Sequence, residues 1–295
     1  MLVKKVGAVP NGLAVRPRNS FFPKPSSWSF EVKAWCLYFA VPPTFGLADL
    51  HLHTLASDGL MSACDLVDFV EQHTDLDVIA VTDHDETSAS LIARAWAAKH
   101  GYRVQVVPGV EVTTREGHLL ALFIEERPPA LRPLQQTAEW VLAKGGLCIA
   151  PHPFSRWTHS INLRALCAAV EHRLLAGVEV LNASLAGRAS RPPAVRFVHQ
   201  HGLAGLGSSD AHMVSMVGLA RTRFAGRTPP DLRRAIEASA TSAEGRFATP
   251  GEMASEAIPQ LARSMVHLPL RRIVRYARAH IAPHHQPTLR SVRHD

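Results

Sequence analysis

The sequence predicts an α/β barrel, with a parallel sheet at its centre and helices around it. From residue 48 onward, short apolar runs alternate with longer helical patterns, which implies crossover connections between parallel strands. Histidine and carboxylate residues also stand at the ends of successive predicted strands, and in a parallel barrel these ends share one mouth. With 295 residues, the chain is long enough for one barrel of roughly 200–250 residues and two tails.

The first half of the predicted barrel has clear helix boundaries. Ser62 can cap a helix whose apolar residues share one face, and Gly101 can end the next helix, which begins at Thr87 or Ser88. Between these helices lie short runs rich in apolar residues. We expect helices at 62–73 and 87–100, and strands at 48–53, 77–82, 104–108 continuing into 109–112, and 118–123.

The second half repeats this alternation. Gly145 and Gly146 separate a helix from the next apolar run, where a turn is expected. We expect helices near 134–144, 163–172 and 193–201, and strands at 147–150, 178–181 and 203–206. Residues 218–224 and a helix near 231–240 complete the barrel by about residue 245, and residues 252–281 are expected to form one or two helices outside it.

Charge divides the chain into three parts. The formal net charge is +7, but residues 1–47 carry six Lys or Arg and one Glu, and residues 246–295 carry eight Lys or Arg and three acids. We interpret 1–47 as a poorly ordered basic extension, 48–245 as the barrel, and 246–295 as a basic helical or disordered extension. Basic tails can contact nucleic acid or anionic lipid, or can simply be solvated. Nucleic-acid binding is therefore open but not indicated.

The sequence does not predict a membrane or secreted protein, although a basic start followed by an apolar run faintly resembles a secretion signal. No stretch reaches the ~18 consecutive apolar residues that a membrane span needs, and residues 34–41, the nearest, are followed by two prolines. That run also lies far from Met1, unlike a secretion signal. The four cysteines form no Cys-x-x-Cys pair. We expect a cytoplasmic protein with no membrane partner, and leave its oligomeric state open.

Candidate metal ligands begin in the first strand. His51 and His53 are two residues apart, so they share one face of that strand with Asp49. Any one such residue has an ordinary explanation in packing or helix capping, but a buried group of imidazoles and carboxylates is costly without a metal ion. The ligand types suit Zn, Mn or Fe. The candidates that follow at later strand ends are Asp58, His84, Glu111, His118, His152, Asp210 and His212.

These motifs resemble one known family. Asp-x-His-x-His (49–53), Ser-Asp-Gly (57–59), Thr-Asp-His-Asp (82–85), Pro-Gly-Val-Glu-Val (108–112), Pro-His-Pro (151–153) and Ser-Asp-Ala-His (209–212) resemble the PHP (polymerase and histidinol phosphatase) family, in order, over about residues 47–225. The resemblance implies a distorted (β/α)7 TIM-like barrel, the PHP fold, with three divalent metal ions (Mn, Fe or Zn).

The same resemblance implies a division of the ligands. One ion would be held by His51, His53, Glu111 and Asp210. Glu111 would also bridge to a second ion held by His118 and His152. The third ion would be held by Asp58, His84 and His212. Within this set, the assignment of His118 rests only on its place in a strand after Glu111.

The implied activity is metal-dependent hydrolysis of a phosphomonoester or phosphodiester, with a metal-bridging hydroxide as nucleophile. The expected substrate is a small phosphorylated metabolite or a nucleotide. Two further residues are assigned to the catalytic machinery. Asp83 is expected to orient a ligand histidine, and Arg156, four residues after His152, is expected to bind the phosphate as a bidentate cation.

Several alternatives remain. A branch of the family acts as a 5′-3′ exoribonuclease or as a nucleoside 3′,5′-bisphosphate phosphatase, but only 33 residues separate His118 from His152, where that branch typically carries a long insertion. A non-catalytic PHP scaffold would have lost ligands, and all nine are present. A metal-dependent amidohydrolase also begins with His-x-His, but it needs a carboxylated Lys or a Glu after its fourth strand.

Overall fold

The computed structural model describes residues 44–254, 257–267, 269–270 and 273–274, all of which belong to one unit, Pro42–Asp295. The predicted N-terminal extension therefore lies outside the described residues up to residue 43. The described residues form one sheet of nine strands in the order β7-β6-β5-β4-β3-β2-β1-β8-β9. They are β1 (Phe45–Leu52), β2 (Val78–Val81), β3 (Gln105–Thr113), β4 (His118–Leu122), β5 (Leu147–Ala150), β6 (Gly177–Asn182), β7 (Ala204–Ser208), β8 (Ala220–Ala225) and β9 (Ser242–Gly245).

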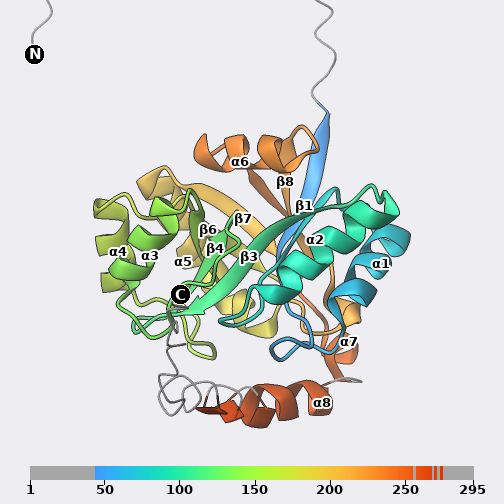
Figure 1. Ribbon diagram of the computed structural model, residues 1–295. Coiled ribbons are helices and arrows are strands. Elements are labelled where there is room, and N and C mark those ends of the chain that lie inside the picture. The colour runs from blue at the N-terminus through green and yellow to red at the C-terminus, as the bar shows by residue number, and fades with distance from the viewer. Residues whose placement is uncertain (1–43, 255–256, 268, 271–272, 275–295) are drawn as a thin grey trace, which may run out of the picture. The chain divides into compact units, whose positions relative to one another are not determined.

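The sheet curls into a nearly closed barrel (Figure 1). The end strand β7 approaches β8, the neighbour of the other end strand, where the Thr222 hydroxyl accepts a hydrogen bond from Gly207 N at 3.0 Å and donates one to Gly207 O at 2.8 Å. Strands β1, β2 and β3 run parallel, as do β5, β6 and β7. The predicted distorted TIM-like barrel is confirmed.

The expectation that all strands are parallel is wrong. Strand β4 is antiparallel to both of its neighbours, β3 and β5, and β8 is antiparallel to β1. The link between β3 and β4 is a short hairpin, which can join only antiparallel strands. Because β4 runs backward, its first residue, His118, lies at the barrel end where the parallel strands finish. The reversal therefore places His118 at the mouth.

Six helices pack against this sheet. They are α1 (Ala63–His73), α2 (Ser88–His100), α3 (Leu134–Ala143), α4 (Leu163–Glu171), α5 (Leu185–His201) and α6 (Pro229–Glu237). Ser62 caps α1 by accepting a hydrogen bond from Asp65 N, and Gly101 ends α2 at a φ of 65°. Figure 1 shows α1 and α2 on one side of the barrel and α3, α4 and α5 on the other. Among the described helices, none combines the length and apolarity needed to cross a bilayer.

Two elements differ from the sequence prediction. Helix α5 begins at Leu185 rather than near Pro193, because Pro192 and Pro193 lie inside the helix instead of in its first turn, where proline is favoured. Strand β9 has the sequence SAEG, which carries no apolar alternation. It forms through backbone pairing with β8, which a side-chain pattern cannot reveal.

Three of the four buried apolar clusters of the described residues lie between the sheet and the helices. One joins the sheet to α3, α4 and α5, a second joins it to α1 and α2, and a third joins it to α6. Beyond the barrel, α7 (Pro250–Ala254), α8 (Ala257–Ala262) and a short π-helical turn η2 (Arg263–His267) continue the chain. Burial of the apolar faces leaves the polar ends of the strands at the mouth.

Candidate metal centre

The two histidines of the first motif lie at the end of β1, and both side chains are fully buried. Backbone hydrogen bonds join the end of β1 to the loop after β7: His53 N donates to Ala211 O at 2.9 Å, and Ala211 N donates to His51 O at 3.3 Å. Asp210 thereby comes within 3.4 Å of both rings, measured from its Oδ1 to each Nε2. Ligands that are 159 and 157 residues apart in the chain thus meet in space.

Glu111 lies where most of the candidate ligands converge. It belongs to β3 and forms a parallel bridge with His84, which follows β2. Its Oε1 lies 2.9 Å from His118 Nδ1 and 3.0 Å from His152 Nε2. Its Oε2 approaches three further ring nitrogens: His84 Nδ1 at 3.0 Å, His51 Nε2 at 3.3 Å and His53 Nε2 at 3.4 Å. One buried carboxylate therefore contacts five imidazoles.

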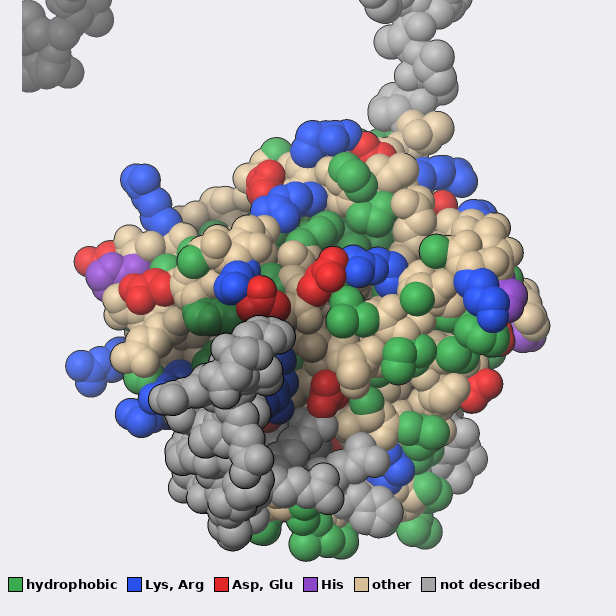
Figure 2. Space-filling model, viewed as in Figure 1, with side chains coloured by type: hydrophobic (Ala, Val, Ile, Leu, Met, Phe, Trp, Pro, Cys, Tyr) green, Lys and Arg blue, Asp and Glu red, His purple; other side chains and the backbone are tan. Residues whose placement is uncertain are grey.

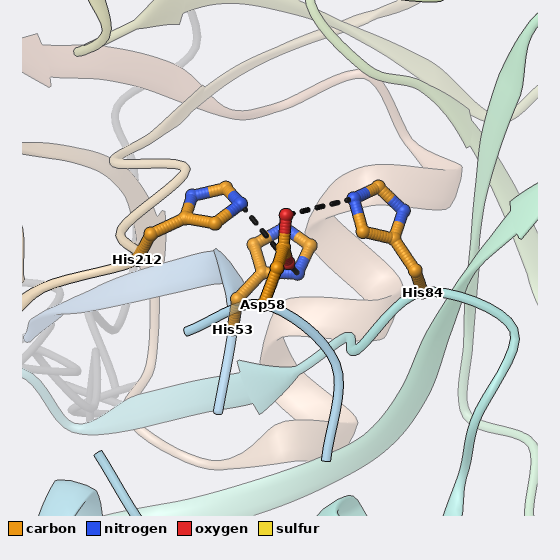
Figure 3. A group of neighbouring side chains, drawn as sticks. All are labelled: His53, Asp58, His84 and His212. Atoms are coloured by element: carbon orange, nitrogen blue, oxygen red, sulfur yellow. Dashed lines mark ion pairs between the residues drawn. The ribbon is translucent and has the colours of Figure 1, made fainter. Parts of the chain in front are cut away.

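A second group surrounds Asp58 (Figure 3). The ring of His212 approaches it from one side and that of His84 from the other, with His53 behind. Asp58 Oδ1 lies 3.3 Å from His212 Nε2 and 3.7 Å from His53 Nδ1, and Asp58 Oδ2 lies 3.8 Å from His84 Nε2. Three nitrogens and a carboxylate at these distances could together hold a divalent ion.

All nine predicted ligands fall into overlapping groups whose ligand atoms lie within 4.8 Å of one another. The groups are His53, Asp58, His84 and His212; His51, His53 and Asp210; His51, Glu111 and His152; and His84, Glu111 and His118. The groups share His51, His53, His84 and Glu111, so the ligands form one continuous centre. How they divide among individual ions stays a prediction.

The polar atoms at this centre fit metal ions better than they fit one another. Five of them are buried and have no hydrogen-bond partner among the described residues: His51 Nε2, His53 Nε2, Asp58 Oδ1, His84 Nδ1 and His118 Nδ1. Leaving a buried polar atom unpaired costs about 1–3 kcal/mol, so native structures contain few of them. A cation coordinated by these atoms removes that cost, and the residues present therefore fit a metal centre.

The pKa shifts follow from the close packing of charge. Burial by itself lowers the pKa of His212, but the carboxylates of Asp58 and Asp210 outweigh it and raise that pKa to about 9. Burial lowers the pKa of His84 to about 3, since Glu111 and Asp58 offset it only in part. His84 is therefore neutral at pH 7, whereas a metal ion has to displace a proton from His212.

Two of the ligands sit on strained backbone. His152 has a φ of 30° and Asp210 a φ of 54°, in the left-handed region that residues other than glycine rarely adopt. Such conformations cost about 1–3 kcal/mol each and persist where the surroundings hold them. At His152 the backbone N–H donates to Glu179 Oε2 at 2.7 Å. The strain aims both side chains into the centre.

The two predicted supporting carboxylates, Asp83 and Asp49, bind the loops that carry the ligands. The Asp83 carboxylate accepts hydrogen bonds from the backbone and hydroxyl groups of Thr54 and Ser57, and Ser57 Oγ lies 3.5 Å from His53 Nδ1. Asp49 accepts hydrogen bonds from the Ser209 and Gly218 backbone, each at 3.0 Å. Each carboxylate therefore fixes a loop that carries a ligand, and the predicted role of Asp83 in orienting a histidine stays a prediction, with Ser57 as the residue between Asp83 and His53.

Arg156 lies in the loop after His152, with an exposed side chain. It forms no hydrogen bond or ion pair with the rest of the described chain. Its assignment as the phosphate-binding cation therefore stays a prediction.

Glu179 is a functional candidate that the sequence motifs missed. It lies in β6, 2% exposed, and its Oε1 accepts a hydrogen bond from His51 Nδ1 at 2.9 Å. Its Oε2 accepts from His152 N at 2.7 Å and from Asn182 Nδ2 at 3.0 Å. Burial raises the pKa of Glu179, but His51 outweighs it and the net pKa is lowered. An ionised Glu179 only accepts, so it fixes His51 with Nδ1 protonated and Nε2 free for a metal.

Replacement of Glu179 by Gln is expected to weaken metal binding by about 10–100-fold, the usual loss when a group that orients a ligand is removed. The amide has one acceptor oxygen, so its NH2 group would face either the His51 or the His152 donor. Metal affinity measured by competition with a chromogenic chelator checks this. The matched control, Glu125→Gln, alters an exposed carboxylate paired with Arg94 and should bind like wild type. Equal affinity of Glu179→Gln and wild type would contradict the role.

Comparison with known proteins gives a consistent picture. A family model described as PHP-associated matches residues 190–241. An uncharacterized protein of Methanocaldococcus jannaschii is 34% identical over 151 residues, covering 46% of this chain and 81% of that protein. The 5′-3′ exoribonuclease Rnm of Salmonella typhimurium is 38% identical over 104 residues, which are 34% of this chain and 35% of the exoribonuclease. The chain thus matches only about a third of that enzyme.

A solved structure shows the same fold. It is a two-domain protein from Bacteroides vulgatus that contains a predicted PHP-like metal-dependent phosphoesterase. The two structures have a TM-score of 0.60 at 20% sequence identity, and the match covers 75% of this chain and 70% of the other. Together with the clustered ligands, these similarities identify the family. The chain belongs to the PHP (polymerase and histidinol phosphatase) domain family.

Proposed function

We propose that this protein is a metal-dependent phosphoesterase whose centre holds three divalent ions. The observation that carries this proposal is the group of five buried ligand atoms around Glu111 and Asp58 that have no hydrogen-bond partner among the described residues. Mn, Fe and Zn all suit the mixture of imidazole and carboxylate ligands. The similarity to phosphoesterases and a nuclease of the PHP family supports the same activity.

The nine side chains would hold the ions in the division implied by the family motifs. Bound divalent ions supply hydroxide at neutral pH and neutralise charge on a phosphoryl group. Glu111 bridges the groups, and its pKa is well below the usual range because neighbouring histidines outweigh its burial, so it presents two anionic oxygens. Asp49, Asp83 and Glu179 keep the ligands in place. Arg156 would bind the phosphate as it enters from the mouth.

A small phosphorylated metabolite or a nucleotide is the substrate that the barrel favours. Between β4 and β5 the chain forms only α3 and its connecting loops, all within the described residues. No separate domain is inserted there to grip a polymer. The second candidate is a 5′-3′ exoribonuclease or a nucleoside 3′,5′-bisphosphate phosphatase, favoured by the local similarity to the Salmonella exoribonuclease.

A substrate screen tests this proposal. The purified full chain, loaded with Mn²⁺, is incubated with phosphomonoesters, phosphodiesters, nucleoside 3′,5′-bisphosphates and short 5′-phosphorylated RNA, and phosphate or nucleotide release is measured. We expect release from small phosphorylated compounds that stops when the metal is chelated. Release from RNA alone would favour the exoribonuclease. Bound metal without any hydrolysis would instead indicate the scaffold alternative and overturn the proposal.

A further inference from the structure

A segment far along the chain reaches the metal centre. Helix α8 and the turn η2 together form residues 257–267, which we call the C-terminal strap. In Figure 1 the strap lies beside the loop that follows β1. The Ser264 hydroxyl donates a hydrogen bond to Asp58 Oδ2 at 2.6 Å, although the two residues are 206 positions apart. Asp58 is the carboxylate shared by the rings in Figure 3.

The direction of this hydrogen bond is fixed by a third residue. Gln260 Nε2, one turn earlier in the strap, donates to Ser264 Oγ at 2.8 Å. Because this bond occupies a lone pair of Ser264 Oγ, the hydroxyl proton of Ser264 points to Asp58. The reverse arrangement would place an oxygen lone pair against a carboxylate, which repels it. Gln260, Ser264 and Asp58 thus form a directed chain of hydrogen bonds.

Arg263 holds the same loop at a second place. Its Nη2 donates to Leu55 O at 2.9 Å and to Ser57 O at 3.1 Å, just before Asp58. Upstream of the strap, Ser215 Oγ donates to Glu252 O at 2.9 Å, and Met253 packs against the apolar cluster of α1 and α2. The strap is therefore anchored to the barrel before it reaches the centre.

The outer face of the strap makes no comparable contact with the described residues. Ile258 is 82% exposed and Met265 is 68% exposed. Figure 2 shows hydrophobic side chains at the lower edge of the view, where Figure 1 places α8. In contrast to this outer face, Arg263 and Ser264 donate hydrogen bonds to the loop, and Gln260 donates to Ser264. A short π-helical turn, as in η2, is frequent at functional sites.

We propose that the C-terminal strap is part of the metal centre and that Ser264 is a positioning residue for the ligand Asp58. Ser264 engages Oδ2, which leaves Oδ1 directed at His212 and His53. Oδ1 is the Asp58 oxygen that is buried without a hydrogen-bond partner. Without the hydroxyl, the carboxylate can rotate, and the group formed by Asp58 and its histidines loses affinity for its ion. This inference rests on the proposed metal centre.

The test compares metal binding in full-length variants. Ser264→Ala removes the hydroxyl, Ser264→Thr keeps it, and Met265→Ala changes the neighbouring exposed side chain. Gln260→Ala removes only the donor behind Ser264. Metal content by mass spectrometry and Mn²⁺ affinity by competition are measured for each. We expect Ser264→Ala to bind one of the ions about 10-fold more weakly, near the lower limit for loss of an orienting group, and Gln260→Ala to show a smaller loss in the same direction.

The controls separate positioning from folding. Ser264→Thr and Met265→Ala should bind metal like wild type, and the metal-free Ser264→Ala protein should melt at the wild-type temperature. Where wild type hydrolyses a substrate, Ser264→Ala should need about 10-fold more Mn²⁺ to reach the same maximal rate.

Two results would overturn the proposal. One is wild-type metal affinity in Ser264→Ala. The other is a higher rate in Ser264→Ala than in wild type at every Mn²⁺ concentration, which would mean that the strap blocks the site. A wild-type protein that binds metal but hydrolyses nothing would refute the proposed function and leave the affinity comparison valid.

Discussion

Replacement of Glu111 by Gln is expected to abolish phosphoester hydrolysis and to remove bound metal. The Glu111 carboxylate contacts five imidazoles, with distances from 2.9 Å to 3.4 Å. Gln has nearly the same shape, but it has one acceptor oxygen and no negative charge. Its NH2 group would face ring nitrogens that need to coordinate metal, so one amide cannot bridge two ions.

We expect the rate to fall by more than about 100-fold, beyond the loss usual for residues that only orient ligands. Phosphate release and metal content, measured on the same preparation, check this. The matched control is Glu126→Gln, because Glu126 is an exposed carboxylate that pairs with Lys144. A Glu111→Gln protein that keeps its full metal content and at least a tenth of the wild-type rate would show that Glu111 does not bridge the centre.

Removal of the metal ions is expected to lower the melting temperature substantially. Without metal, five buried ligand atoms of the centre lack a hydrogen-bond partner among the described residues. A metal present at 1,000 times its Kd stabilises the folded state by about 4 kcal/mol per site. In a domain of this size each kcal/mol corresponds to roughly 2–4 °C, so loss of one such ion should lower Tm by about 8–16 °C.

Thermal melting of the protein with and without a chelator measures this change. Adding Mn²⁺ or Zn²⁺ in excess over the chelator should restore the original Tm, which controls for effects of the chelator itself. The Asp210→Ala protein should show a smaller difference, because it lacks a carboxylate that lies 3.4 Å from both His51 and His53. A Tm that is the same in both conditions would mean that no metal stabilises the fold.

The sequence was sufficient to predict the positions of those candidate ligands that local spacing specifies. His51 and His53 are two residues apart on one strand, and Asp210 and His212 follow the end of another, so the motifs themselves place them at the mouth. His118 also proved to lie beside Glu111, but for a different reason from the one expected. Its position depends on the reversal of β4, which a parallel-barrel pattern does not contain.

Residues that act through long-range contacts could not be predicted. Glu179 stands alone in a buried strand, and its role depends on contacts with His51, 128 residues earlier, and His152. The contact between Ser264 and Asp58 depends on where the strap docks, and neither residue's neighbours in sequence encode it. Asp83 sits in the correct motif, but only its contacts with Thr54 and Ser57 show that it holds a loop.

Metal-dependent phosphate release by wild type, His51→Ala and Asp210→Ala, measured side by side, tests the proposed centre most directly. Both residues are buried. His51 contacts the carboxylate of Glu111, and Asp210 contacts the ring of His53. We expect wild type to release phosphate only with Mn²⁺, Fe²⁺ or Zn²⁺ present, and each variant to lose more than about 100-fold of that rate. Phosphate release by either variant at the wild-type rate would contradict a phosphoesterase centre built from these ligands.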